Sequence, residues 1–146
     1  LIKAPFSMDQ IYNFIESVIP SIEIVDSRFQ DWTKAGISNI IADNGANAFW
    51  IKGKEFKDLD NINFNNHAVK VYINENLIET GNAKNVLNNP VNSITWLVNT
   101  LAKQNKNLPK ESYISTGTCT RAIPLMKNDI VMADFGFLGI VEFQIK

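Results

Sequence analysis

The stretch HAVKVYINENLIETG, residues 67–81, decides the architecture because it has the pattern of a β-hairpin. Val69, Val71 and Ile73 alternate with polar residues, which is the period of a strand with one buried face. Asn74-Glu75-Asn76 has the composition of a turn, and the apolar residues after it begin a returning strand. This stretch therefore predicts two antiparallel strands joined by a tight turn.

The segments beside the hairpin add a loop, a helix and more strands. Residues 54–66 are polar and rich in Asn and Asp, so they predict a surface loop. Asn89 can cap a helix that has Pro90 at its first position. Apolar residues then recur at helical spacing, namely Val91, Ile94, Leu97, Val98 and Leu101. Three further strands are expected near residues 112–116, 129–134 and 138–145.

The first residues of the chain predict a helix followed by a strand. Ser7 and Gln10 have the spacing of a capping box. Apolar residues after them recur at helical spacing, so residues 8–18 are expected to form an amphipathic helix. Pro20 closes that helix, and residues 21–28 are expected to form a strand.

Residues 36–43 are ambiguous between a short helix and an irregular segment. A turn at Gly45 should lead into a strand that includes Phe49 and Ile51. Strands outnumber helices and gather in the second half of the chain. Residues 1–146 therefore predict a single α+β domain dominated by its sheet.

Composition excludes several classes of protein. The 146 residues are 45% hydrophobic and 20% charged, and 14 basic against 15 acidic residues give a net charge of −1. Without a basic block, neither nucleic acid nor an anionic membrane is an expected partner. No apolar run approaches the roughly 18 residues of a membrane-spanning helix. A single cysteine excludes an internal disulfide and fits a reducing compartment, so we expect a cytoplasmic protein.

Charged residues interrupt the strand expected at residues 21–28. Because alternate strand residues share a face, Glu23 projects away from the apolar side chains of this strand. Glu23 is either a ligand for a hard cation in a polar cavity or a carboxylate in solvent or paired with a lysine, and the pattern by itself favours the second. Asp26 and Arg28 are expected to pair with each other or to hold a loop.

Two further stretches contain candidate site residues. Asp43 and Asn44 precede Gly45 and form a plain turn signal, although they are also able to line a site and orient a bound water. Hydroxyl side chains surround Gly117, where a turn can present backbone N–H groups to a substrate carboxylate. The residues of this candidate anion nest are Ser115, Thr116, Gly117, Thr118 and Thr120.

Some conspicuous side chains have simpler interpretations. Cys119 is a poor candidate nucleophile because His67 is the sole histidine that can serve as its base. A half-buried thiol is the expected state of Cys119, and a surface position is expected for His67. Trp50, Trp96 and Phe135 are expected in the core.

Four stretches, taken in order, resemble successive motifs of one enzyme family. They are PSIEIVDSR (20–28), IADNGANAFWIKG (41–53), NVLNNPVNSITWLVNTLA (85–102) and TGTCTRAIPLMKNDIVMADFGFLG (116–139). The family is that of 2-keto-4-pentenoate hydratase and 4-oxalocrotonate decarboxylase, within the fumarylacetoacetase-like superfamily. The superfamily's C–C hydrolases typically have proline at the position of Cys119, which argues against that branch.

The resemblance implies a mixed, strongly curved β-roll with a few flanking helices. It also implies a Mg²⁺ or Mn²⁺ ion held by three carboxylates, of which Glu23 matches the third. Asp43 and Asn44 would lie near the metal, and Thr116, Gly117, Thr118 and Thr120 near a small 2-oxo acid substrate. The other two carboxylates come from a Glu-x-Glu motif upstream of a segment similar to residues 1–5, so the chain is expected to be the C-terminal part of a longer protein.

Three functions follow from the resemblance. The first is hydration of 2-hydroxypenta-2,4-dienoate in aromatic meta-cleavage catabolism, and the alternative is decarboxylation of 4-oxalocrotonate. In both reactions a cation that chelates the 2-oxo acid would stabilise the enolate. The third is an inactive fragment that serves only in assembly, because one glutamate alone cannot hold Mg²⁺ tightly. A homo-oligomer is expected, with a partner enzyme of the same pathway as a further expectation.

Overall fold

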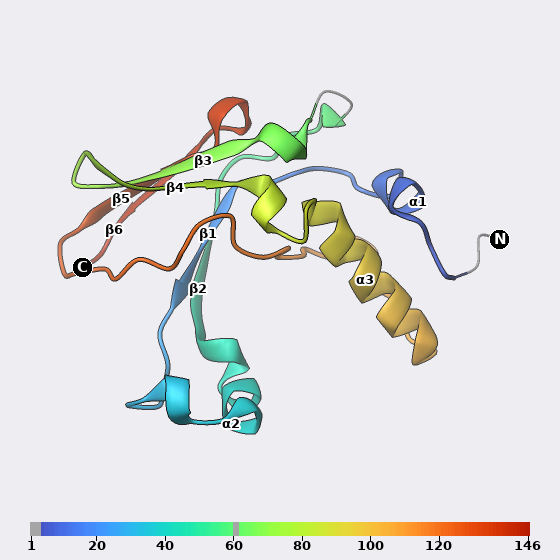
Figure 1. Ribbon diagram of the computed structural model, residues 1–146, viewed down its shortest axis with the longest axis horizontal. Helices are drawn as coiled ribbons and strands as arrows, with labels where there is room; N and C mark the ends of the chain where they lie inside the picture. The colour runs from blue at the N-terminus through green and yellow to red at the C-terminus, as the bar shows by residue number, and fades with distance from the viewer. Residues whose placement is uncertain (1–3, 60–61) are drawn as a thin grey trace.

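The structure is a computed structural model that describes residues 4–59 and 62–146. Figure 1 shows a four-stranded sheet, a long helix beside it and a two-stranded ribbon that extends away from both. Residues 60 and 61 of the predicted loop, and residues 1–3, lie outside the described residues. The helices are α1 (Met8–Tyr12), α2 (Ile37–Ala42) and α3 (Pro90–Lys103), and the strands are β1 (Ser21–Val25), β2 (Asn47–Lys52), β3 (Ala68–Ile73), β4 (Asn76–Asn82), β5 (Ile130–Asp134) and β6 (Ile140–Gln144). Short 3₁₀ turns are η1 (Trp32–Lys34), η2 (Asn44–Ala46), η4 (Phe64–Asn66), η5 (Ala83–Asn85) and η6 (Gly136–Leu138).

The predicted hairpin is confirmed and forms half of the larger sheet. β3 and β4 pair antiparallel, and the turn between them places Asn74 and Glu75 at φ of 49° and 68°. β5 pairs with the other edge of β3, and β6 pairs with β5, so the strand order is β4-β3-β5-β6. Val69, Val131 and Val141 are buried on this sheet.

β1 and β2 form a separate antiparallel ribbon. Glu23 lies opposite Trp50, and Ser21 lies opposite Lys52, with a register shift between Ile24 and Val25. α2 and the turns η1 and η2 lie at the far end of the ribbon (Figure 1). A two-stranded ribbon cannot bury both of its faces by itself.

The helices begin where the sequence predicts, but one of them is short. The capping box of Ser7 and Gln10 is present at α1, and the Asn89 side chain accepts a hydrogen bond from the Val91 N–H at the start of α3. The prediction of a helix over residues 8–18 is wrong after Tyr12. Val18 instead forms a bridge with Phe56, and the two residues exchange backbone hydrogen bonds of 2.9 and 2.8 Å.

A small apolar core joins α1 and α3. Ile11, Phe64, Ala83 and Val91 form its buried centre, and Cys119 packs against this centre. Ile94 and Val98 from the predicted stripe of α3 also contact it. Trp96 was expected in the core, but it projects from the opposite face of α3 and is 66% exposed.

Much apolar surface is left uncovered by the described part of the chain. The accessible surface is 10329 Å², whereas a compact monomer of 16.4 kDa would expose about 7,500 Å². Exposed side chains gather on the ribbon and its far end, including Phe49 at 67%, Ile37 at 79% and Ile41 at 71%. An apolar surface of this extent is typical of a face that another chain or segment covers.

Two other expectations about the fold differ from the structure. Residues 112–116 are not a strand, because this segment crosses beside the ribbon and contacts it through side chains such as Tyr113. All strand pairings among the described residues are antiparallel, and neither sheet curls into a closed roll. The α+β class is confirmed, whereas the strongly curved roll is not.

Candidate active-site cleft

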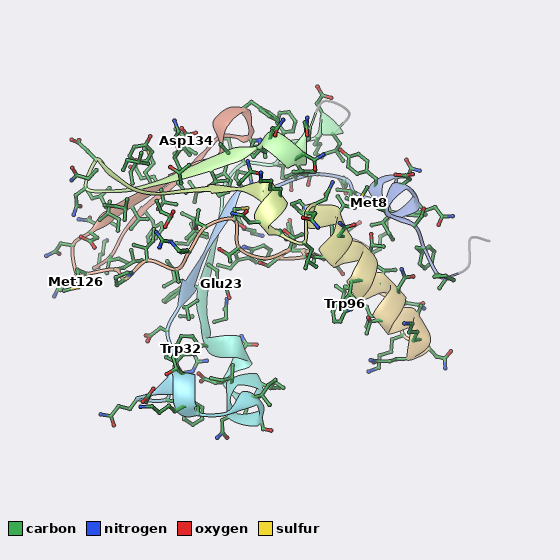
Figure 2. All side chains as sticks on the ribbon, viewed as in Figure 1. Met8, Glu23, Trp32, Trp96, Met126 and Asp134 are labelled. Carbon is green, nitrogen blue, oxygen red and sulfur yellow. The ribbon has the colours of Figure 1, made fainter. Side chains whose placement is uncertain are left out.

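Glu23 lies in the middle of β1 on the face away from Ile22 and Ile24, as its position in the strand predicts. Its side chain is exposed, and its Oε1 accepts a hydrogen bond of 2.7 Å from the Asn47 amide. Figure 2 shows Glu23 on the ribbon, between the sheet and the lobe that contains Trp32. One carboxylate oxygen is thus held by the protein while the group remains accessible.

Asp43 is buried and faces its own loop. Its carboxylate accepts hydrogen bonds from the Ser27 hydroxyl at 2.6 Å and from the backbone N–H and the Nε of Arg28. The Ser27 hydrogen bond lowers the pKa of Asp43 most, and Arg28 lowers it further, while burial acts in the opposite direction. Asp43 is therefore ionised at neutral pH and already engaged.

Arg28, which follows β1, holds the loop between β1 and β2 through several hydrogen bonds. Besides Asp43, its guanidinium donates to the backbone carbonyls of Asp26 and Asn47, at 3.1 and 3.2 Å. Of the two roles expected for Arg28, holding a loop is the one observed. Asn47 connects this arrangement to Glu23, because its carbonyl receives Arg28 while its amide donates to the glutamate.

The threonine loop, residues 116–120, is attached to the end of β4. The Cys119 carbonyl accepts hydrogen bonds from the Asn82 N–H at 3.1 Å and from the Asn85 amide at 2.8 Å. Gly81 allows this approach, because a Cβ atom there would lie 2.1 Å from the Cys119 carbonyl oxygen. Strand β4 and the threonine loop therefore contact each other backbone to backbone.

Side chains of the threonine loop are partly committed to the loop itself. The Thr118 hydroxyl donates to the Thr120 carbonyl at 2.8 Å, and Gly117 adopts a φ of 127°. Cys119 is half-buried, as expected, and burial raises the pKa of its thiol. The thiol is thus protonated at neutral pH and unsuited to nucleophilic attack.

The ribbon and the threonine loop line one open cleft of about 2260 Å³. Glu23, Trp50 and Tyr113 contribute to its wall together with Thr116, Gly117, Thr118 and Thr120. Asp43 and Asn44 are not among the described residues that line it. Glu23, the predicted metal ligand, and the predicted substrate loop therefore line one cleft, whereas the two predicted catalytic residues do not line it.

Two groups beside the cleft were missed or misjudged from the sequence. The Lys52 ammonium lies 3.7 Å from the centre of the Tyr113 ring and 5.4 Å from that of Trp50. Its position two residues after Trp50 on a strand was a usable signal. His67 was expected at the surface, but at the end of η4 it is buried with its ring edge-on to Phe137.

The described residues do not make a complete metal site by themselves. An exposed carboxylate is a suitable donor for a hard cation. However, residues 4–59 and 62–146 contain no group of three His, Cys, Asp or Glu side chains placed to hold a metal ion. Glu23 therefore does not form a metal site with other such side chains among the described residues.

Known proteins resemble the chain along most of its length. It is 28% identical over 128 residues to 4-oxalocrotonate decarboxylase from Pseudomonas putida, which covers 88% of this chain and 48% of that enzyme. It is 32% identical over 137 residues to 2-oxo-hept-4-ene-1,7-dioate hydratase from Escherichia coli, which covers 90% and 51%. The chain spans about half the length of these curated relatives, and no protein-family model matches it.

Solved structures agree with these relatives. The 4-oxalocrotonate decarboxylase from Pseudomonas putida G7, complexed with magnesium and adipate, superimposes with a TM-score of 0.85 at 28% identity. The match covers 92% of this chain and 51% of that one. The same enzyme complexed with calcium and acetate has a TM-score of 0.80.

Among the described residues, no helix is long and apolar enough to cross a membrane. The chain belongs to the family of 2-keto-4-pentenoate hydratase and 4-oxalocrotonate decarboxylase.

Proposed function

We propose that the chain is part of a metal-dependent lyase that hydrates an unsaturated 2-oxo acid, with 2-hydroxypenta-2,4-dienoate as the simplest substrate. The observation that carries this proposal is the placement of Glu23 and the threonine loop on one cleft. Relatives named as hydratases, among them 2-hydroxypent-2,4-dienoate hydratase from Pseudomonas putida at 37% identity over 86 residues, support it.

In this proposal Glu23 is one ligand of a divalent cation, Mg²⁺ or Mn²⁺. The magnesium and calcium in the solved relatives support a divalent cation. A cation bound there would supply Lewis acidity to the 2-oxo group. The Asn47 amide fixes one oxygen of Glu23 and leaves the other free for a cation. The remaining ligands have to come from outside the described residues.

The other predicted residues have separate parts in the proposal. Backbone N–H groups around Gly117 bind the substrate carboxylate, since that turn is exposed to the cleft. Asp43 positions Arg28, and through Asn47 it positions Glu23. We therefore assign Asp43 a positioning role, whereas Asn44 is exposed and stays a candidate for contact with substrate or water.

Decarboxylation of 4-oxalocrotonate is the second candidate function. The two solved structures, with TM-scores of 0.80 and 0.85, are both decarboxylases, and this favours it. Assembly without catalysis is a third candidate, supported by the large uncovered apolar surface. A homo-oligomer, a complex with a partner enzyme and a cytoplasmic location complete the proposal.

Substitution of Glu23 in the complete protein tests the proposal. We expect Glu23→Gln to abolish Mg²⁺-dependent turnover and to weaken Mn²⁺ binding measured by titration, because the substitution removes an anionic ligand. Glu75→Gln, in the exposed β3–β4 turn, is the matched control. Water addition to 2-hydroxypenta-2,4-dienoate and CO₂ release from 4-oxalocrotonate separate the two enzymes. Unchanged turnover in Glu23→Gln would remove Glu23 from the site.

A further inference from the structure

Trp50 lies directly opposite Glu23 in the ribbon, so the two side chains stand on one face. Paired residues of antiparallel strands share a face, with Cα atoms about 5 Å apart. Ile22 and Ile24 alternate with Glu23 along β1 and lie on the other face. The indole of Trp50 is therefore next to the carboxylate that the proposed function assigns to the cation.

Two neighbours hold the Trp50 ring in place. The Tyr113 ring packs edge-on against the indole, with 6.1 Å between ring centres. The Lys52 ammonium lies 3.7 Å from the centre of the Tyr113 ring and 5.4 Å from that of Trp50, where a cation attracts both aromatic faces. An indole that is already held in this way loses little rotamer freedom when it contacts a ligand.

The indole N–H of Trp50 is a donor without an acceptor among the described residues. Its Nε1 atom is buried, and no group in residues 4–59 and 62–146 accepts a hydrogen bond from it. An indole N–H can donate but cannot accept. A buried donor without an acceptor is unfavourable and rare in native proteins. The Trp50 N–H therefore indicates an acceptor that the described residues do not supply.

Other donors that line the cleft give no such indication. Lys106 and Lys146 line it and have no ion pair among the described residues, but both are exposed and lie outside the ribbon. An exposed ammonium donates to water when no ligand is present, so it does not need a protein partner. Arg121 also lines the cleft, and its guanidinium binds Glu79 with contacts of 2.7 and 2.8 Å. Trp50 is thus the donor that gains most from a ligand.

We propose that the Trp50 indole N–H donates a hydrogen bond to an oxygen of the 2-oxo acid bound beside Glu23, so that Trp50 is a substrate-binding residue. This inference rests on the proposed function, which places the 2-oxo end of the substrate at Glu23. Both residues line the same cleft, and their direct pairing places the indole beside a ligand at Glu23. Because the buried donor is satisfied only when substrate is present, the hydrogen bond stabilises the complex and not the free protein.

The indole N–H resonance of Trp50 tests this contact in the complete protein. The probe is 2-oxopentanoate with Mg²⁺, because this acid has the carboxylate and 2-oxo groups but no alkene to hydrate. In protein labelled with ¹⁵N-tryptophan, the probe should shift the Trp50 Hε1 resonance downfield, as formation of a hydrogen bond does. The resonance of Trp96, which is exposed on α3 (Figure 2), should not move. Trp32→Phe and Trp96→Phe assign the other tryptophans of this chain, so the assignment does not depend on a Trp50 variant.

Calorimetry measures how much the hydrogen bond contributes to binding. Trp50→Phe keeps an aromatic ring against Tyr113 and removes the N–H. This variant should bind 2-oxopentanoate about tenfold to a hundredfold more weakly, the effect of losing one hydrogen bond to a charged ligand. Trp96→Phe is the matched control and should bind the probe as the wild type does.

These measurements separate failure of the contact from failure of the proposed function. A Trp50 resonance that the probe does not move, or binding that is unchanged in Trp50→Phe, overturns the contact whatever the turnover. An N–H that points at the Tyr113 ring gives an upfield resonance that the probe leaves in place, and this result also overturns the contact. Absence of turnover with 2-hydroxypenta-2,4-dienoate and with 4-oxalocrotonate overturns the proposed function, while a downfield shift with 2-oxopentanoate would still establish the contact.

Discussion

Replacing Gly81 by alanine should push the threonine loop away from β4. A Cβ atom at this position would lie 2.1 Å from the Cys119 carbonyl oxygen and 2.7 Å from the Thr120 Cγ2. Ordinary van der Waals contact begins near 3.4 Å, so strand and loop must separate by more than an ångström. This movement breaks the hydrogen bonds that Asn82 and Asn85 donate to the same carbonyl, at 3.1 and 2.8 Å.

The cost of Gly81→Ala follows from these contacts. Overpacking costs about 1–3 kcal/mol, and each lost hydrogen bond costs about 1 kcal/mol, so we expect a loss of about 2–4 kcal/mol once relaxation is shared between the terms. If Gly81 did not contact Cys119, Gly81→Ala would be expected to stabilise the protein instead. Gly81 does not have a positive φ, and alanine at a permitted backbone conformation stabilises a protein by about 0.4–1 kcal/mol.

Urea unfolding of the complete protein measures this change in stability. Thr80→Ala, at the exposed neighbouring position of β4, is the control and should alter stability by less than about 0.5 kcal/mol. Faster labelling of Cys119 in Gly81→Ala would show that the loop has moved. A Gly81→Ala protein as stable as the wild type, or more stable, would refute the close packing of β4 against the loop.

Three further predictions concern titration, thiol reactivity and packing. Because the pKa of Asp43 is lowered from its usual value of 3.8, its ionised carboxylate stabilises the folded state at pH values above 3.8, and this stabilisation is lost as the carboxylate is protonated. Acidification below about pH 4 should therefore change Trp32 fluorescence in a variant without the other tryptophans, and Asp43→Asn should abolish this transition. Alkylation of Cys119 at pH 8 should be at least about tenfold slower in the native protein than in urea, because burial raises its pKa. In urea unfolding, Val91→Ala should cost about 2–3 kcal/mol, whereas Trp96→Ala on the exposed face of α3 should cost less than about 0.5 kcal/mol.

Features specified by neighbouring residues could be predicted from the sequence. The turn at Asn74 and Glu75 and the cap at Asn89 each depend on a few adjacent residues, and both are present. The orientation of Glu23 follows from strand alternation alone, and its exposure agrees. Trp96 was expected in the core but is exposed, because it lies outside the apolar stripe that begins at Val91.

Features that depend on distant partners could not be predicted. The helical pattern of residues 8–18 gives way because Val18 finds a backbone partner in Phe56, far along the chain. Arg28 was considered with Asp26 because of their spacing, but the register shift after Ile24 and the return of the loop bring Asp43 to it instead. The spacing of residues in the sequence indicates neither the register shift nor the path of the loop that brings Asp43 back to Arg28.

The hydrogen bonds that Arg28 donates to Asp43, Asp26 and Asn47 have a consequence for protein engineering. They tie together the backbone on both sides of residues 29–42, and the Asp26 N–H also donates to the Ala46 carbonyl at 2.9 Å. Because hydrogen bonds join the two ends of this segment, we expect that it can be replaced without a change in the register of the ribbon. Residues 29–42 should therefore be exchangeable between relatives as one block, provided that Arg28 and Asp43 are both retained.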